Sequence, residues 1–336
     1  MKKELYVLTN DRIYLKRDFY TSNNDLANIL TSCGKFHRIN LICRKSYDPL
    51  NFKIKVPDLK IIKNLLLNQS LSNNQKKFLM ISITPYNFLM MLYLNLKLKT
   101  KIQGYVYLRS DGFKEYQNKL GIIGYYLYYL MFKIITNNFS VIACTKQLSK
   151  VRNAKIVTPS EIDQTWLNNL KNPDLKKPKL LYIGRIRKEK GIFSLISLLK
   201  KVKIEFNFIG IGGNQNKKIT DKIFLLKEII NIKSLKKKID QSNIFILPSY
   251  TEGSPKVILE SLARLRPIII FDEIKHVKKN YYGVFVCKRN ATHLKTTIRY
   301  IMKNYSKIGK NMKKNKLVLK SDFQSKFAGI INGQVL

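Results

Sequence analysis

Two glutamates, Glu252 and Glu260, are separated by seven residues in a stretch whose polar positions lie between two apolar runs. A carboxylate accepts hydrogen bonds from hydroxyl groups and pairs with cations. Glu252 precedes a predicted helix start, where free backbone N–H groups attract anions such as phosphate. The alternative is an ordinary loop acid followed by a solvated helix position, so the surrounding elements decide what the two acids can do.

These surrounding elements are a strand, a helix and a second strand. Residues 244–247 read IFIL and residues 268–271 read IIIF, short β-branched runs typical of buried strands. Between them, Ser254 is the expected N-cap and Pro255 the expected first helical residue. Pro267 ends the helix. The first acid therefore follows the carboxyl end of a strand, where open α/β sheets bind ligands.

Two basic residues occupy a similar position earlier in the chain. Residues 179–186 form a predicted strand that ends at Gly184-Arg185, and Lys190-Gly191 starts a predicted helix over residues 192–200. Cations fixed at a strand end and a helix start can neutralise an anion at the same sheet edge. Chance is the competing explanation in so basic a chain, and the placement at element ends argues against it.

The two patterns together, E-x7-E before a proline and G-R-(x)n-K-G, resemble the signature of the retaining, nucleotide-sugar-dependent glycosyltransferases of group 1. The resemblance extends to residues 156–166, similar to that family's exit from its first domain, and to residues 281–286, similar to its last strand. It implies an α/β protein of the GT-B architecture, with two Rossmann-like domains facing each other across a cleft.

The resemblance also gives a role to each motif residue. Arg185 and Lys190 would bind the diphosphate of the sugar donor, which gains negative charge as the glycosidic bond breaks. Glu252 would contact hydroxyls of the donor sugar, and Glu260 the ribose hydroxyls. Further donor-binding positions lie at the helix start and in a glycine-rich turn; they are Gly253, Ser254, Pro255, Lys256, Gly210 and Gly212.

In many members of that family, a histidine of the first domain lies near the reacting sugar. The comparable strand end here, residues 109–112, has Asp111 and no histidine, so we expect Asp111 to hydrogen-bond the sugar or acceptor. His37, His276 and His293 receive no role. No D-x-D motif occurs, and two cations with a helix N-terminus can neutralise a diphosphate, so we expect neither a metal nor a cofactor besides the donor substrate. The expected mechanism is front-face transfer with an oxocarbenium-like transition state.

The chain is long enough for two domains. Its first half alternates apolar strands with helical patterns; the strands are expected at residues 5–9, 39–43, 78–83, 104–108 and 140–144. The first turn lacks G-x-G-x-x-G, which argues against a dinucleotide dehydrogenase. We expect an acceptor-binding domain over 1–170, a linker over the proline-containing 171–178, a nucleotide-sugar domain over 179–315, and a basic tail over 316–336 forming a helix that packs back on the first domain.

Charge and cysteine content limit the partners and the compartment. The formal net charge is +42, from 63 basic and 21 acidic residues, and it favours anionic partners. A nucleic-acid-binding protein is one alternative, but no aromatic-basic RNA motif or arginine-rich recognition helix supports it, so we expect no specific nucleic acid. Four cysteines without C-x-x-C spacing are typical of reduced thiols in a cytoplasmic protein.

Two apolar stretches stand out from this basic background. Residues 87–98 and 121–135 are rich in Tyr, Met and Leu and are flanked by lysines. They are either helices buried against a sheet or surfaces that enter a lipid interface, with Tyr at the level of the head groups. No segment has the uninterrupted apolar length of a spanning helix, so we expect at most peripheral association with an anionic membrane face.

The sequence thus predicts a retaining glycosyltransferase that moves a sugar from a nucleoside-diphosphate sugar to a glycan or lipid-linked acceptor in cell-surface polysaccharide synthesis. A related sugar-nucleotide enzyme such as an epimerase, which would turn over donor without acceptor, stays open as an alternative. A catalytically inactive sugar-binding homologue is disfavoured by the intact Arg185, Lys190 and Glu252.

Overall fold

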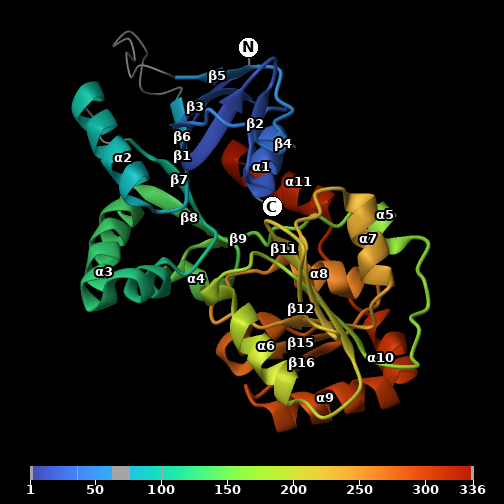
Figure 1. Ribbon diagram of the computed structural model, residues 1–336. Coiled ribbons are helices and arrows are strands. Elements are labelled where there is room, and N and C mark those ends of the chain that lie inside the picture. The colour runs from blue at the N-terminus through green and yellow to red at the C-terminus, as the bar shows by residue number, and fades with distance from the viewer. Residues whose placement is uncertain (1–2, 36, 63–75, 100–101, 334–336) are drawn as a thin grey trace. The chain divides into compact units, whose positions relative to one another are not determined.

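The computed structural model describes residues 3–35, 37–62, 76–99 and 102–333 (Figure 1). The chain divides into two compact units. The first consists of Met1–Pro159 together with Ser321–Leu336, and the second of Ser160–Lys320. In the part of the chain described, no helix is both long enough and apolar enough to cross a bilayer.

The first unit is built on a mostly parallel sheet whose strands run in the order β5-β3-β1-β6-β7-β8-β9. The strands form where apolar side chains are buried on both faces, as parallel sheets require. They are β1 (Lys3–Leu15), β3 (His37–Lys45), β5 (Leu59–Ile61), β6 (Lys76–Ile81), β7 (Gly104–Leu108), β8 (Phe139–Ala143) and β9 (Lys155–Ile156).

One part of this sheet extends beyond the strand that was expected over residues 5–9. The strand β1 continues to Leu15 and forms an antiparallel hairpin with β2 (Phe19–Thr21), which in turn pairs with β4 (Phe52–Lys53). Polar residues occur here because the side chains of residues 10–20, except Ile13, are half-buried or exposed and can reach water.

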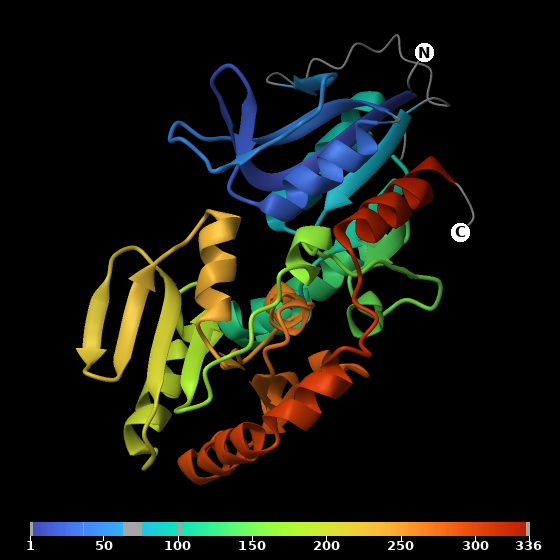
Figure 2. The same cartoon turned by 90° about the vertical axis from the view of Figure 1, so that its right-hand side faces the viewer.

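In the described residues of the first unit, the helices are α1 (Asn24–Cys33), α2 (Pro85–Leu98), α3 (Gly112–Thr136), α4 (Lys146–Ser149) and α11 (Lys320–Asn332). Although α11 comes from the end of the chain, its Phe323, Phe327 and Ile331 are buried in the first core. The ring of Phe327 lies edge-on to that of Tyr107, 5.0 Å between centroids. Figure 2 shows this red helix beside the blue and cyan elements of the first unit.

The second unit has a seven-stranded sheet in the order β12-β13-β11-β10-β14-β15-β16, parallel except for β12. Its strands are β10 (Lys179–Ile183), β11 (Asn207–Gly213), β12 (Lys217–Thr220), β13 (Ile223–Lys227), β14 (Ile244–Leu247), β15 (Ile268–Phe271) and β16 (Val284–Cys287). Without β12, the order runs third, second, first, fourth, fifth, sixth along the chain, which is the Rossmann order.

The helices of the second unit contribute apolar residues that bury this sheet. They are α5 (Gln164–Leu167), α6 (Ile192–Lys201), α7 (Ile232–Asp240), α8 (Lys256–Ala263), α9 (Ala291–Lys303) and α10 (Tyr305–Met312), with short 3₁₀ turns η2 (Lys188–Lys190) and η3 (Asp272–Lys278). The helix α8 begins one residue later than expected. Its cap is Pro255, which has extended backbone angles and makes no side-chain cap hydrogen bond, so Ser254 is not the N-cap.

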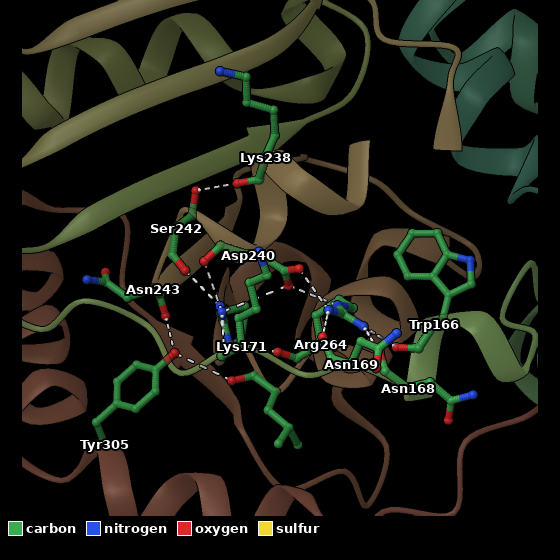
Figure 3. Close-up of polar contacts among 12 residues, drawn as sticks. Trp166, Asn168, Asn169, Lys171, Lys238, Asp240, Ser242, Asn243, Arg264 and Tyr305 are labelled. Carbon is green, nitrogen blue, oxygen red and sulfur yellow. Dashed lines mark hydrogen bonds and ion pairs between the residues drawn. The ribbon is translucent and has the colours of Figure 1, made fainter. Parts of the chain in front are cut away.

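The boundary between the units also differs from the expected linker over 171–178. Ile162 and Trp166 already belong to the second core, so the chain changes units at Pro159. Residues after Trp166 are held by a buried arginine, Arg264, which donates to the carbonyl oxygens of Trp166, Asn168 and Asn169 at 2.8–2.9 Å (Figure 3). These bonds attach a segment that its prolines had marked as a linker.

The same arginine also pairs with Asp240 at 2.8 Å, and a second buried arginine, Arg266, donates to the carbonyl oxygen of Lys171 at 2.8 Å. Both guanidinium groups are almost fully enclosed, and Asp240 is the carboxylate that faces both. Buried charges are tolerated where most of their donors find acceptors, and here backbone carbonyls supply them.

Candidate functional site

The candidate site lies at the carboxyl edge of the second sheet, where the strand order reverses between β10 and β14. In open α/β sheets, ligands bind in the crevice at such a switch point. The segment that follows β10 carries Arg185 and Lys190, and the segment that follows β14 carries Glu252. The fold therefore brings the basic and acidic motif residues to one sheet edge.

Lys190 and Glu252 form a direct ion pair. The Lys190 Nζ atom lies 2.6 Å from Glu252 Oε1, and the side chains are 21% and 12% exposed. The Ser249 hydroxyl donates to the same carboxylate oxygen at 2.7 Å, and His276 Nε2 is 2.9 Å from the backbone oxygen of Glu252. The Glu252 carboxylate is thus oriented by Lys190 and Ser249.

The two loops that carry this pair are held together by a close backbone approach at Gly191. Its φ is +67°, and a Cβ atom there would lie 1.9 Å from the Pro248 carbonyl oxygen. The backbone N–H of Tyr250 also donates to the carbonyl of Glu189 at 3.1 Å. Only glycine combines this left-handed backbone with such a short separation, so Gly191 fixes how the cation meets the carboxylate.

Arg289 contacts the loop that contains Pro248, and the sequence analysis did not identify it. Its guanidinium lies 4.3 Å from the ring centroid of Tyr250 and 4.4 Å from that of Phe271. It donates to the Pro248 carbonyl at 2.9 Å and to Glu273 at 2.6 Å. Burial acts to raise the pKa of Glu273, but the Arg289 hydrogen bond and charge hold it below its usual value. The sequence signal that could have identified Arg289 is a basic residue two positions after the last strand, β16.

A cavity of about 780 Å³, within the size range of small-molecule sites, opens at the ends of β10 and β11 of the second unit, and neither Lys190 nor Glu252 is among the residues that line it. Four of the expected site residues line it: Arg185, Gly212, Lys256 and Glu260. Sequence reasoning missed other polar lining residues, which are Arg187, Asn214, Gln215, Lys217 and Glu228. The cavity therefore combines four basic side chains, Arg185, Arg187, Lys217 and Lys256, with two acidic ones, Glu228 and Glu260.

Arg185 and Glu260 approach this cavity from opposite elements. Arg185 is exposed, and its backbone carbonyl accepts a 2.8 Å hydrogen bond from the Tyr182 hydroxyl. Burial, followed by the Glu252 charge, raises the pKa of that hydroxyl, so it stays a donor. Glu260 is half-buried on the fifth position of α8. A basic and an acidic group can thus bind separate parts of one ligand.

The expected glycines have different roles. Gly212, with φ of +130°, packs so closely that a Cβ would lie 2.1 Å from the carbonyl oxygen of Gly184. It lines the cavity. Gly210 is buried inside β11, where a Cβ would meet Leu225 at 2.7 Å, and it is not among the lining residues. Gly253 is buried in the loop before α8.

Lys256 makes an ion pair that the sequence did not suggest. Its Nζ lies 3.1 Å from Glu161 Oε1, and Lys320 Nζ lies 3.6 Å from the other oxygen of the same carboxylate. Glu161 follows the point where the chain enters the second unit, and Lys320 precedes the point where it leaves. The first residue of α8 is therefore tied to both connections between the units.

Asp111 lies in the first unit and caps a helix. Its side chain accepts a 3.2 Å hydrogen bond from the Lys114 backbone N–H at the start of α3. Nearby along the chain, Arg109 contacts Asp11 at 3.3 Å and donates to the Ser82 hydroxyl at 3.1 Å. This second polar cluster joins Ser82 and Arg109, at the carboxyl ends of β6 and β7, to Asp11 inside β1. Asp11 had no sequence signal because it lies beyond the strand that was expected over residues 5–9.

Within the described ranges, no group of three or more His, Cys, Asp or Glu residues is arranged to hold a metal ion. No disulfide joins cysteines within the described residues, and burial raises the pKa of Cys33 and Cys43 to about 12, so both are thiols at neutral pH.

Comparison with known proteins adds family information. Residues 167–317 match the family described as "Glycosyl transferases group 1". The chain is 29% identical over 168 residues to an N,N'-diacetylbacillosaminyl-diphospho-undecaprenol alpha-1,3-N-acetylgalactosaminyltransferase of Campylobacter jejuni, covering 48% of this chain and 44% of that protein. It is 30% identical over 93 residues to a putative teichuronic acid biosynthesis glycosyltransferase of Bacillus subtilis, covering 27% and 24%. The chain thus spans less than half the length of either relative.

Among solved structures, the chain is similar over 98% of its length to HepE of Anabaena in complex with UDP-glucose, with a TM-score of 0.69, 11% identity and coverage of 100% of that chain. It is also similar to WaaG, a glycosyltransferase involved in lipopolysaccharide biosynthesis, with a TM-score of 0.65, 13% identity, and coverage of 98% and 100%. At these identities the similarity concerns the fold, and it confirms the expected GT-B architecture.

Proposed function

We propose that this chain, which has the GT-B fold and carries a group 1 glycosyltransferase domain, transfers a sugar with retention from a nucleoside-diphosphate sugar to a glycan or lipid-linked acceptor in cell-surface polysaccharide synthesis. The observation that carries the proposal is that the carboxyl edge of one sheet carries both the Lys190–Glu252 pair and a cavity lined by Arg185 and Glu260. Cations for a diphosphate and carboxylates for sugar hydroxyls meet there at one sheet edge.

In the proposed reaction, Arg185 and Lys190 stabilise the leaving diphosphate. Negative charge grows on that group as the bond to the sugar breaks, and fixed cations bind it most strongly in the transition state. Lys190 is held by Glu252 in this structure. When the diphosphate binds Lys190, the Glu252 carboxylate becomes available to accept hydrogen bonds from the sugar hydroxyls. Binding of the diphosphate would therefore favour binding of the sugar.

Retention would follow from attack on the face that the diphosphate leaves, through an oxocarbenium-like transition state. Glu252 is oriented by Lys190 and Ser249, which suits a carboxylate that binds hydroxyls better than one that must form a covalent bond. Glu260 would accept from the ribose hydroxyls, and Asp111 would hydrogen-bond the sugar or acceptor. The two cations remove the need for a metal ion, so EDTA is expected to leave turnover unchanged.

The lipid-linked acceptor has support from one relative. The name of the Campylobacter protein describes a diphospho-undecaprenol substrate, which is a lipid-linked one. We therefore also propose that the protein is cytoplasmic and associates peripherally with the cytoplasmic face of a membrane.

The first test is a thermal-shift measurement with UDP, GDP, ADP and CDP in the absence of metal. One nucleotide is expected to raise the melting temperature at concentrations where the others do not, because binding to the folded state alone stabilises it. Sugar-nucleotides of that base would then be screened with acceptors. A folded protein that responds to none of the four nucleotides would contradict the proposal.

A further inference from the structure

Helices α2 and α3 of the first unit carry apolar side chains on the faces that point to solvent. On α2, the buried residues are Asn87, Met91 and Leu94, as expected for a helix packed on a sheet. The exposed large apolar residues are Leu89, Leu92, Tyr93 and Leu96, and Leu96 is 80% exposed. Their spacing of i, i+3, i+4 and i+7 forms a second apolar stripe.

The helix α3 repeats this arrangement on a larger scale. Its inner face buries Gly124, Tyr128, Met131, Phe132 and Ile135. Its outer face exposes Tyr126, Leu127, Tyr129 and Leu130. A helix that is apolar all round is normally buried all round, so both helices lack a partner for one side. Figure 1 shows α2 and α3 next to each other at one flank of the first unit.

A break in α3 adds a third group of exposed residues. Gly121 has φ of +63° and ψ of −149°, which no helix allows, and a Cβ there would have no heavy atom within 4 Å. The break divides α3 into two segments, visible at an angle in Figure 1. Leu120, Ile122 and Ile123 flank it, and Ile123 is 74% exposed. Large aliphatic residues thus lie together at an open bend, where they are exposed to solvent.

The charges around this face are almost all positive. Among the described residues of α2 and α3, the one acid is Glu115, and it pairs with Lys119 at 2.7 Å. Lys97, Lys114 and Lys133 lie on the same two helices near their ends. Lysine side chains at such positions reach past an apolar surface to anionic head groups.

We propose that the exposed face of α2 and α3 is a membrane-docking surface that enters the head-group and upper acyl region of a bilayer containing anionic lipid. The Tyr-rich face with lysines at its ends has the composition of membrane interfaces. Lysine is depleted in interfaces between proteins, and a net charge of +42 on each chain opposes pairing with a second copy. The inference deepens the peripheral location proposed above and rests on it, but it does not depend on the donor site.

The test is vesicle flotation at about 0.15 M salt, where charges still act over about 8 Å. The full chain is mixed with vesicles of phosphatidylcholine alone or with phosphatidylglycerol added. We expect flotation with the anionic vesicles, weaker flotation with the neutral ones, and partial release at 1 M salt. The double variant L96E/I123E is expected to lower partitioning by about tenfold or more, because two aliphatic side chains no longer enter the bilayer.

The matched control is I232E, which places the same charge on an apolar residue of the second unit that is 51% exposed. It should float like the unchanged protein. Circular dichroism and melting temperature establish that the variants are folded, and the nucleotide thermal shift measures the donor site independently. Flotation without any nucleotide response would contradict the proposed function and leave the docking surface intact.

Three results would overturn the docking surface: no flotation of the full chain with anionic vesicles, flotation of L96E/I123E equal to that of the unchanged protein, or equal partitioning to both vesicle types. Size-exclusion chromatography tests whether a second copy of the chain, and not lipid, covers this face. A dimer that L96E/I123E converts to a monomer would show that the face binds a second copy and not lipid.

Discussion

Lys190 and Glu252 hold each other at 2.6 Å, so replacing either changes the state of the other. We predict that Glu252→Ala lowers transfer by about a hundredfold or more while nucleotide binding is kept, because Lys190 is left free for the diphosphate. Lys190→Ala is predicted to weaken both, because the phosphate contact is lost. Initial rates and nucleotide titrations by calorimetry measure the two effects. Lys188→Ala, at an exposed position of the same turn, should change neither; equal turnover in all three variants would refute the assignment.

Gly191 tests whether the approach of the two loops matters. We predict that Gly191→Ala destabilises the protein by about 2 kcal/mol or more, because φ is +67° and the new methyl group would meet the Pro248 carbonyl. Urea unfolding measures the loss. Gly309→Ala is the control, since that glycine lies in α10 with open space around it, and it should stabilise by about 0.5–1 kcal/mol. A neutral Gly191→Ala would mean that the loops are not constrained there.

At this scale, the sequence was sufficient to predict the positions of residues that depend on nearby strand ends and helix starts. Arg185, Lys190, Glu252 and Glu260 were placed by strand ends and helix starts within a few positions of them, and those element assignments carry them to one sheet edge. Arg289 was missed because its contacts with Pro248 and Glu273 join segments far apart along the chain. The Lys256–Glu161 pair was missed for the same reason, because it joins residues 95 positions apart.

At the scale of elements, the Arg264–Asp240 pair fixes the segment that enters the second unit. We predict that Asp240→Asn destabilises this unit by about 3–5 kcal/mol, because two enclosed guanidinium groups lose their shared carboxylate. Urea unfolding followed by tryptophan fluorescence is a direct probe, since Trp166 lies in that segment and is the single tryptophan. The exposed pair Lys218–Asp221 gives the control Asp221→Asn, for which a change below about 1 kcal/mol is expected.

The element types were largely predictable because apolar periodicity is local. The strands over 244–247, 268–271 and 104–108 have the expected bounds. The β1–β2 hairpin was not predicted, because its polar side chains do not follow an apolar pattern. The strand β2 is also held by β4, which lies about 30 residues further along the chain. The start of α8 was displaced because Pro255 has an extended backbone, which a proline at a first helical position would not have.

At the scale of the whole molecule, the first unit depends on a helix from the other end of the chain. We predict that Phe327→Ala destabilises the first unit by about 3–5 kcal/mol, because that side chain is fully buried against Tyr107 and the rest of the first core. Ser325→Ala, at an exposed position of the same helix, is the control. Differential scanning calorimetry should show a lower transition for the first unit alone; a shift confined to the second unit would contradict this assignment of α11.

The split composition of the first unit has a consequence for synthesis on the ribosome. Translation adds about 5–20 residues per second, so the segment Ser160–Lys320 occupies about 8 to 30 seconds between the two parts of the first unit. The second unit is continuous and can close its core within that interval. The first unit starts earlier but finishes later, because its apolar surface for Phe323 and Phe327 stays uncovered until α11 emerges. The nascent chain therefore offers a chaperone an open binding surface for most of its time on the ribosome.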